Sequence, residues 1–367
     1  MRIGKSGISV LHYNNVVTEC NFNELRKSMV ITKNAYPRAA LIGNPSDGYF
    51  GKTIAFVFDN YRASVQLYET PSVAFLSASR DLNEFDDLAD LDRKISRFGY
   101  YGGIRLLKAS ARKFLIYCRE RGISLEKKNF TIRYQSDIPN RLGLAGSSAI
   151  ITAAIRAIAE FYGVELPPAE LANVVLAAER DELSIPAGLQ DRVAQAFNHP
   201  VYMDFNREHM EQFGFGKYEK IDLPEGVNFY VAYRTDLAEG SEILHSRLKD
   251  DYQAKVPQVL AAMDEWADLT VKMREAFVNR NLTEVPRLIN RNFDLRSEVC
   301  SGSISEKNRR MVNIARNAGA SAKFTGSGGA IVGTYEDEKM FERLRQDLSV
   351  FDVDIVKPHI VTGAKKS

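Results

Sequence analysis

Pro139-Asn-Arg-Leu-Gly143-Leu-Ala-Gly146-Ser147-Ser148-Ala149 joins a strand pattern to a helix pattern, and this stretch decides the fold. Residues 130–134 alternate in polarity as a half-buried strand does, and the apolar residues after 149 recur at helical spacing. The two glycines therefore lie at the start of a helix, where unpaired N–H groups and the positive end of the helix dipole favour a phosphate. Two glycines and two serines also fit an ordinary turn with a helix cap.

Length and composition indicate a soluble globular protein of roughly two domains. The chain has 367 residues, of which 45% are hydrophobic and 26% are charged, and its formal net charge is only +2. This balance argues against nucleic acid and against an anionic membrane surface as partners. Because no long apolar run suggests a signal peptide or a membrane span, we expect a cytoplasmic protein.

Several reaction classes are disfavoured by the motifs that the sequence lacks. The three cysteines and five histidines are scattered, so we expect neither a zinc site nor a disulfide framework. There is no G-x-S-x-G motif of a hydrolase. Gly51-Lys52-Thr53 resembles the end of a P-loop, but Ser46 stands where that motif requires glycine.

The order of elements predicts an α+β protein that changes character near residue 223. Short strand patterns separated by turn residues dominate the first part, and long helical periodicities dominate the second. Besides 130–134, we expect strands at 39–42, 53–58, 64–67, 73–76, 227–233, 331–335 and 350–356, and helices at 102–119, 147–162, 168–180, 256–279, 282–299, 305–318 and 337–348. Residues 1–31 form an extension in this division, 32–222 a first domain and 223–367 a second.

A second glycine cluster, Lys323-Phe-Thr-Gly326-Ser-Gly328-Gly329-Ala, precedes the strand expected at 331–335. It fits either a close approach of backbone to a ligand or a tight hairpin. Glu179 and Asp191, which lie between the two clusters, are candidates for a metal ligand and for a residue that activates a hydroxyl. A solvated helix face at Glu179 and a helix cap at Asp191 are the structural alternatives.

The order of three motifs resembles that of the GHMP kinases, a superfamily that includes galactokinases, homoserine kinases, mevalonate kinases and phosphomevalonate kinases. The motifs are Pro37-Arg38-Ala-Ala-Leu-Ile-Gly43-Asn44-Pro45-Ser46-Asp47, then the stretch 139–149, then 323–330. Ile42-Gly-Asn-Pro-Ser-Asp47-Gly-Tyr-Phe-Gly51 and Gly188-Leu-Gln-Asp-Arg-Val-Ala-Gln195 are similar, more narrowly, to plant-type glucuronokinases. The resemblance implies a two-lobed fold, with a mixed α+β N-terminal lobe, a split β-α-β C-terminal lobe and the active site in the cleft between them.

The resemblance also implies roles for individual residues. Asp191 and Arg38 are the expected catalytic residues, Asp191 as base or orienting group. Backbone groups of one loop are expected to hold the phosphates of ATP: Arg141, Gly143, Leu144, Ala145, Gly146, Ser147, Ser148 and Ala149. Ser148 and Glu179 are the expected Mg²⁺ ligands. The sugar site is expected to comprise Asp47, Asn44, Gly326, Gly328, Gly329 and Arg192.

The function implied is an ATP-dependent sugar-1-kinase that phosphorylates the anomeric hydroxyl of a free sugar, with D-glucuronate favoured. A uronic acid needs a cation for its carboxylate, and Lys52, Arg62, Arg192 and Arg234 are candidates, with Arg192 first. Another small-molecule GHMP kinase, for a different hexose, a heptose phosphate or mevalonate, is an alternative. A catalytically silent sugar and ATP sensor is a further one. The sequence supports no prediction of oligomeric state.

Overall fold

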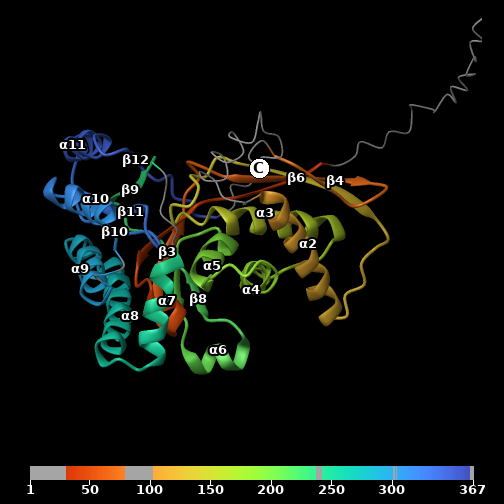
Figure 1. The fold of residues 1–367 in the computed structure, drawn as a ribbon, viewed down its shortest axis with the longest axis horizontal. Coiled ribbons are helices and arrows are strands. Elements are labelled where there is room, and N and C mark those ends of the chain that lie inside the picture. Colours follow the sequence, from red (N-terminus) through yellow and green to blue (C-terminus); the bar gives the residue numbers. More distant parts are fainter. Residues whose placement is uncertain (1–29, 79–101, 237–241, 301, 303, 364–367) are drawn as a thin grey trace, which may run out of the picture.

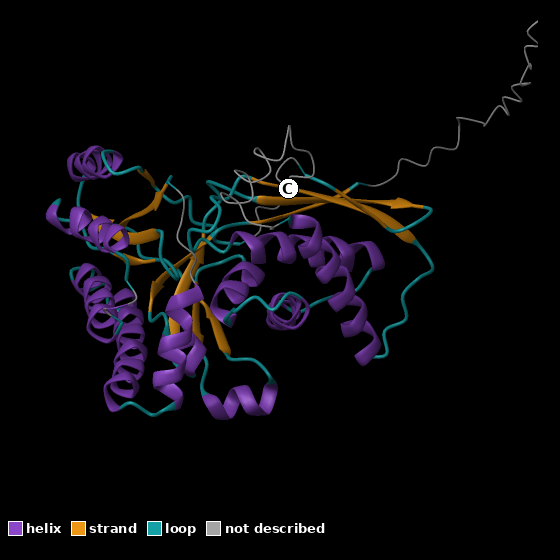
Figure 2. Ribbon diagram, viewed as in Figure 1, coloured by secondary structure: helices purple, strands orange, loops and turns teal. Residues whose placement is uncertain are grey.

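The computed structural model describes residues 30–78, 102–236, 242–300, 302 and 304–363. The extension expected at residues 1–31 lies almost entirely outside the described residues. Within them, helices and strands alternate irregularly, and three four-stranded sheets form the framework (Figures 1 and 2). The predicted α+β class is confirmed.

The first sheet is long and flat, and helices cover one of its faces (Figure 1). Its order is β1-β4-β6-β5, with β1 (Ile31–Ala35), β4 (Ala63–Thr70), β6 (Asn129–Ser136) and β5 (Ala74–Leu76). Only β5 pairs in parallel, against β6. The covering helices are α2 (Gly103–Glu120) and α3 (Gly146–Tyr162), and α3 packs directly on β1 and β4.

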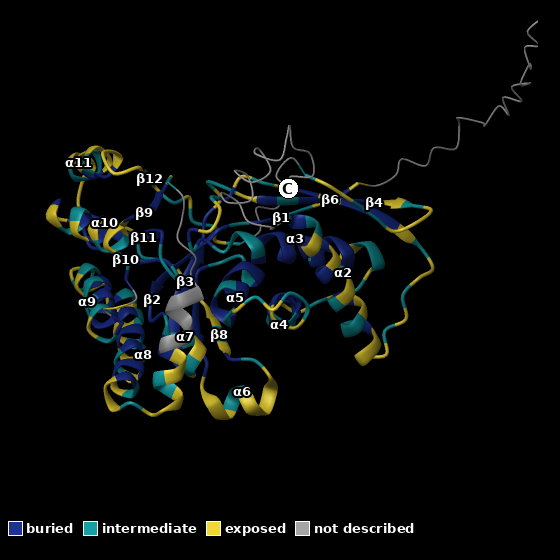
Figure 3. Cartoon of the chain, viewed as in Figure 1, coloured by how far each residue is buried: buried dark blue, intermediate teal, exposed yellow. Residues whose placement is uncertain are grey.

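The second sheet is antiparallel, with the order β2-β3-β7-β8. Its strands β2 and β3 are almost entirely buried (Figure 3). Its strands are β2 (Arg38–Ile42), β3 (Lys52–Val57), β7 (Val201–Asp204) and β8 (Lys217–Lys220). Helix α5 (Leu189–Phe197) packs on β2, β3 and β7, helix α4 (Pro168–Ala177) packs on α5, and α6 (Arg207–Phe213) follows β7 in the chain. Strand β2 is apolar after Arg38 and fully buried, as expected of a strand covered on both faces.

The third sheet, β10-β11-β9-β12, is built only from strands that follow residue 227. They are β9 (Asn228–Arg234), β10 (Lys323–Phe324), β11 (Ala330–Tyr335) and β12 (Val353–Val356). The helices of this part are α7 (Glu242–Gln253), α8 (Pro257–Val278), α9 (Glu284–Val299), α10 (Glu306–Asn317) and α11 (Glu338–Ser349). Helices α9, α10 and α11 contact the third sheet, whereas α8 packs on β2 and β3 of the second. The division expected at 222/223 falls between β8 and β9.

After β12 the chain returns to the second sheet. Val361 N donates to Val57 O at 3.0 Å, and Asp59 N donates to His359 O at 3.0 Å. Ile360 forms a bridge with Phe58. The segment 357–361 therefore ties the end of the chain to the end of β3.

Two local differences from the expected elements bear on the site. The helix expected at 168–180 ends as α-helix at Ala177, and residues Ala178–Glu182 form a π-helical turn. Such turns are frequent at functional sites. The segment 189–197, which the sequence analysis did not assign, forms helix α5.

Candidate active site

The loop before α3 has the backbone that a phosphate cradle requires. Arg141, Gly143 and Ala145 all have positive φ, at 59°, 68° and 61°. Ala145 is the N-cap of α3, and no side chain caps the helix there, since the Ser148 hydroxyl donates to Ala145 O at 3.0 Å instead. The positive end of α3 is therefore not neutralised by a capping side chain.

Gln195 of α5 fixes the strained residue in this loop. Its buried side-chain Nε2 donates to Ala145 O and to Tyr36 O, both at 2.9 Å. A left-handed conformation costs alanine about 1–2 kcal/mol, so it persists only where the surroundings enforce it. The sequence analysis gave Gln195 no role, although it lies one helical turn after Asp191.

The two glycine clusters lie against each other, with β2 beside both. Thr325 Oγ1 donates to Gly143 O at 3.2 Å, and Arg38 N donates to Leu144 O at 3.1 Å. A Cβ added at Gly143 would lie 3.0 Å from Gly328 O and 3.3 Å from Ser327 N. Gly143 is thus required both for its positive φ and for this close approach.

Four charged side chains, of which three are buried and Asp191 is partly exposed, form a cluster beside the phosphate loop. Arg38 Nη2 lies 2.5 Å from Asp191 Oδ1, and Arg38 also donates to Thr325 O. Arg192 Nε donates to Glu179 Oε2 at 2.6 Å, and its Nη1 lies 3.1 Å from Asp191 Oδ2. Glu179 is only 1% exposed, and burial raises the pKa of its carboxyl group. Two arginines and two carboxylates are therefore held together from β2, α5 and the π-helical turn.

The π-helical turn explains why Glu179 is buried although it belongs to the run Glu179-Arg-Asp-Glu. Arg180 and Asp181 are exposed, while Glu179 faces Arg192. Successive residues of a helical turn point in different directions, so Glu179 can face inward while its two neighbours face solvent. The alternative of a solvated face does not hold for Glu179.

Asp47 faces the same cluster from the turn after β2. Burial, followed by the negative charge of Asp191, raises its pKa to about 7, while Arg38 and Arg192 act in the opposite direction. A Cβ added at Gly188 would lie 2.8 Å from Asp47 Oδ2, so the absence of a side chain at 188 leaves room for that carboxyl group. Asp47 and Asp191 therefore line one site.

Asn44 and Lys323 link β2 to the second glycine cluster. Lys323 Nζ donates to Asn44 Oδ1 at 2.5 Å, to Ala40 O at 2.6 Å and to Phe324 O at 2.9 Å. Asn44 O accepts from Asn292 Nδ2 at 3.1 Å. Burial, with Arg296 and Arg38 nearby, lowers the pKa of Lys323 well below its usual value. This network positions the expected sugar ligand Asn44.

Most of the cations considered for a substrate carboxylate contact carboxylates of the chain. Lys52 forms an ion pair with Asp204, and the Arg234 guanidinium binds Asp236 at 2.6 and 2.8 Å. Arg192 holds Glu179 and Asp191 as described above. Arg62 is exposed. The geometry thus assigns Arg192 to the charged cluster, and no described contact distinguishes one of the four as a substrate ligand.

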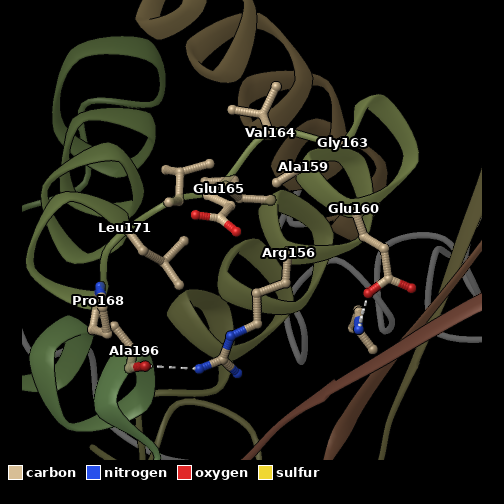
Figure 4. Close-up of a pocket in the computed structure, with 12 residues that line it drawn as sticks. Arg156, Ala159, Glu160, Gly163, Val164, Glu165, Pro168, Leu171 and Ala196 are labelled. Atoms are coloured by element: carbon tan, nitrogen blue, oxygen red, sulfur yellow. Dashed lines mark hydrogen bonds and ion pairs between the residues drawn. The ribbon is translucent and has the colours of Figure 1, made fainter.

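A cavity of about 490 Å³ lies at the other end of α3 and α5, away from this chemistry (Figure 4). Arg156 extends into it, and its Nη2 donates to the carbonyls of Gln195 and Ala196 at 2.7 and 3.0 Å. These carbonyls belong to the last turn of α5. The arginine therefore acts as a C-terminal cap of that helix.

Comparisons with known proteins agree with the motif order. Residues 105–199 match the family described as "GHMP kinases N terminal domain", and residues 273–350 match "GHMP kinases C terminal". The chain is 39% identical to "Probable glucuronokinase 2" and 37% to "Glucuronokinase 1", both of Arabidopsis thaliana. These alignments cover 83% and 82% of this chain and 84% of each relative.

The fold is also that of a solved kinase. The crystal structure of Lactococcus lactis galactokinase complexed with galactose superposes with a TM-score of 0.71 at 16% identity, over 92% of this chain and 95% of that one. At this identity the comparison speaks for the fold, and the two-lobed architecture expected from the sequence is confirmed. Among the described helices, none is long and apolar enough to cross a membrane.

Proposed function

Because this chain belongs to the GHMP kinases, we propose that it is a glucuronokinase, which transfers the γ-phosphoryl group of ATP to the anomeric hydroxyl of D-glucuronate. The contact between Arg38 and Asp191 carries this proposal, since it lies where both glycine clusters meet. The Arabidopsis glucuronokinases supply the substrate class. The contacts within the charged cluster disfavour the alternative of a silent sensor, which needs no activating carboxylate.

Asp191 is the group that orients or deprotonates the sugar hydroxyl. The hydroxyl oxygen bonds to the γ-phosphorus, its proton passes to the carboxylate, and the bond from phosphorus to the β-phosphate oxygen breaks to release ADP. An anomeric hydroxyl is more acidic than an ordinary alcohol, which makes it a suitable partner for a carboxylate. Arg38 contacts the same carboxylate and provides positive charge beside the transferred group.

The loop 141–149 would hold the ATP phosphates through backbone N–H groups at the uncapped start of α3. Left-handed residues on either side of Leu144 curve this backbone into a concave path. The alternative of a simple N-capped turn is disfavoured, because the N-cap residue is Ala145, which makes no side-chain cap hydrogen bond. Ser148 instead donates its hydroxyl to the loop carbonyl.

Ser148 and Glu179 fit a Mg²⁺ site that is completed by phosphates. A hydroxyl and a carboxylate are hard oxygen donors, and Mg²⁺ at such sites uses one or two protein ligands besides phosphate and water. Both described contacts of the Glu179 carboxylate with Arg192 use Oε2. The metal would neutralise the charge that develops on the phosphates during transfer.

Asp47 is proposed to bind a sugar hydroxyl opposite Asp191. Its carboxyl group shares the site with Asp191, and Gly188 leaves space beside it. Asn44, held by Lys323, and the backbone at Gly326, Gly328 and Gly329 would form the wall of the sugar site. Arg192 remains the first candidate from the sequence for the uronate carboxylate, but its contacts support the different role of holding Glu179 and Asp191.

A panel of sugars tests the function directly. The purified protein would be incubated with Mg²⁺, ATP and, in turn, glucuronate, galacturonate, glucose, galactose and mevalonate, with ADP release as the readout. We expect ADP release with glucuronate and a phosphorus NMR signal of a sugar 1-phosphate. Phosphorylation of another hydroxyl or of another acceptor alone would replace the proposed substrate, and the absence of transfer to any acceptor would overturn the kinase assignment.

A further inference from the structure

Arg296 of α9 is a buried arginine that none of the sequence motifs contains. Its side chain is 2% exposed and lies on the same helix face as Ile289 and Asn292. An arginine on the buried face of an amphipathic helix is unusual, because burying a charge is costly unless a partner compensates for it. Its surroundings therefore need an explanation.

The guanidinium of Arg296 binds two backbone carbonyls of the second glycine cluster. Nη1 donates to Gly326 O at 2.8 Å, and Nη2 donates to Ser327 O at 3.1 Å. The guanidinium carbon also lies 5.0 Å from the centre of the Phe324 ring. One rigid, planar group thus fixes two successive peptide carbonyls, which a lysine ammonium could not match in geometry.

Because peptide groups are planar, fixing these two carbonyls also fixes the direction of the N–H groups on the opposite side of the loop. In a trans peptide the N–H of one residue points away from the carbonyl of the residue before it. With the carbonyls of Gly326 and Ser327 directed at Arg296, the N–H groups of Ser327 and Gly328 point away from it. The Cβ position of Gly143 lies 3.3 Å from Ser327 N, so the phosphate loop is on that other side.

The charge of Arg296 is not balanced by a described carboxylate. Arg316 on α10 provides a comparison, since it also lies over an aromatic ring and donates to carbonyls, at Asn290 and Ala322, but it has Asp294 as an ion-pair partner at 2.6 Å. Among the described residues Arg296 has no carboxylate in salt-bridge contact, while the Nε atoms of Arg296 and Arg316 both lack a hydrogen-bond partner. Burial lowers the pKa of Arg296 to about 10, which leaves the group protonated at neutral pH.

We propose that Arg296 is a positioning residue for nucleotide binding. It holds Gly326 and Ser327 so that the N–H groups of Ser327 and Gly328 face the phosphates on the loop 141–149, and its unbalanced charge favours the anionic polyphosphate. This role rests on the proposed function in one respect, namely that the protein binds ATP. It does not depend on which sugar is phosphorylated. In this proposal the second glycine cluster contacts the ATP phosphates as well as the sugar, whereas the sequence analysis expected it to contact the sugar only.

The test compares Arg296→Met with Arg296→Lys and with the matched control Arg316→Met. Thermal unfolding of each variant would be followed with and without Mg-ATP, and KM for ATP and kcat would be measured with the active sugar. We expect Arg296→Met to lose most of the stabilisation by Mg-ATP and to raise KM for ATP about tenfold or more, as loss of a charge-assisted contact predicts. Arg296→Lys is expected to be intermediate, because the charge remains without the planar fork.

Arg316→Met is expected to lower the melting temperature without changing KM for ATP. Unchanged nucleotide stabilisation and unchanged KM in Arg296→Met would overturn the proposal. Arg296→Met does not decide the question if it fails to fold. In that case Arg296→Lys would overturn the proposal if its KM for ATP and its increase in melting temperature with Mg-ATP equal those of the wild type. A wild-type protein that Mg-ATP stabilises but that phosphorylates no sugar would refute the proposed function and leave the binding role of Arg296 measurable. A wild-type protein that Mg-ATP does not stabilise would refute both.

Discussion

Arg38 at the start of β2 and Asp191 in the first turn of α5 are joined by a 2.5 Å contact between Nη2 and Oδ1. The arginine also donates to Thr325 O in the second glycine cluster. One side chain therefore links the proposed catalytic carboxylate to the part of the chain that carries the third sheet. Changes at this position should affect catalysis and the fit of the two glycine clusters together.

Replacement of Asp191 by asparagine should abolish most activity without removing nucleotide binding. The amide keeps the shape of the side chain but cannot accept the proton, so we expect kcat to fall by about a hundredfold or more. Single-turnover phosphate transfer measures the chemical step, and Mg-ATP stabilisation checks that the site is intact. Turnover close to that of the wild type would remove Asp191 from the mechanism.

Replacement of Glu179 by glutamine should raise the Mg²⁺ concentration needed for half-maximal activity, by about tenfold or more, because a neutral amide is a poorer ligand than a carboxylate. A Mg²⁺ titration at saturating ATP measures this. Asp181→Asn is the control, since Asp181 lies two residues away in the same turn, is exposed and pairs with Lys113 at 2.7 Å. The assignment fails if both variants titrate as the wild type does.

Arg192→Leu should impair the metal site and turnover together while leaving sugar discrimination unchanged. Removing this guanidinium leaves the carboxylate of Glu179 buried without its cation, which costs about 3–5 kcal/mol of folding stability in comparable buried pairs, and it removes one of the two cations beside Asp191. The measurements are denaturant unfolding, a Mg²⁺ titration and the ratio of kcat/KM for glucuronate to that for glucose. A large fall in this ratio would instead show that Arg192 binds the carboxylate of the substrate.

Asp47 should make both stability and sugar binding depend on pH. Burial raises its pKa in the folded protein to about 7 from the ordinary value of 3.8, so between these values the folded state binds a proton that the unfolded state does not. Stability should therefore fall as pH rises from about 4 to about 7 and be independent of Asp47 above that. Asp47→Asn should flatten this part of the pH profile of unfolding.

The same titration predicts the direction of the effect on sugar affinity. The ionised carboxylate accepts a stronger hydrogen bond from a sugar hydroxyl than the neutral acid does. We therefore expect KM for the sugar to fall as pH rises through about 7 in the wild type, and to be higher and flat in Asp47→Asn. Identical pH profiles of KM in both proteins would exclude Asp47 from the sugar site.

The sequence predicted elements well wherever periodicity was long or turn residues were strong. Helix α11 was expected at 337–348 and occurs at Glu338–Ser349, and α3 begins one residue before its expected start at Ser147. Short strands with little alternation, such as β1 and β8, were missed because their pairing is decided by partners distant in sequence. The strand expected from Val350 begins at Val353, since residues 350–352 turn after α11.

The sequence predicted those site residues that stand in recognisable motifs, but not those whose role depends on contacts distant in the chain. Arg38, Asp47, Glu179 and Asp191 stand in or near recognisable motifs, and the structure brings all four into one cluster. Gln195, Lys323 and Arg296 each donate to backbone carbonyls far away in the chain, and no local pattern specifies such partners. For Arg296 the available signal was a charge on a largely apolar helix face.

The return of residues 357–361 to β3 has a mechanical consequence. The chain passes from the second sheet to the third between β8 and β9, and it comes back after β12, so two tethers join these parts instead of one. Two attachment points define an axis, so the connections restrict movement of one part against the other to rotation about that line. Arg38 and Thr325, which lie in the two different parts, would separate and meet again along one fixed path during such a rotation.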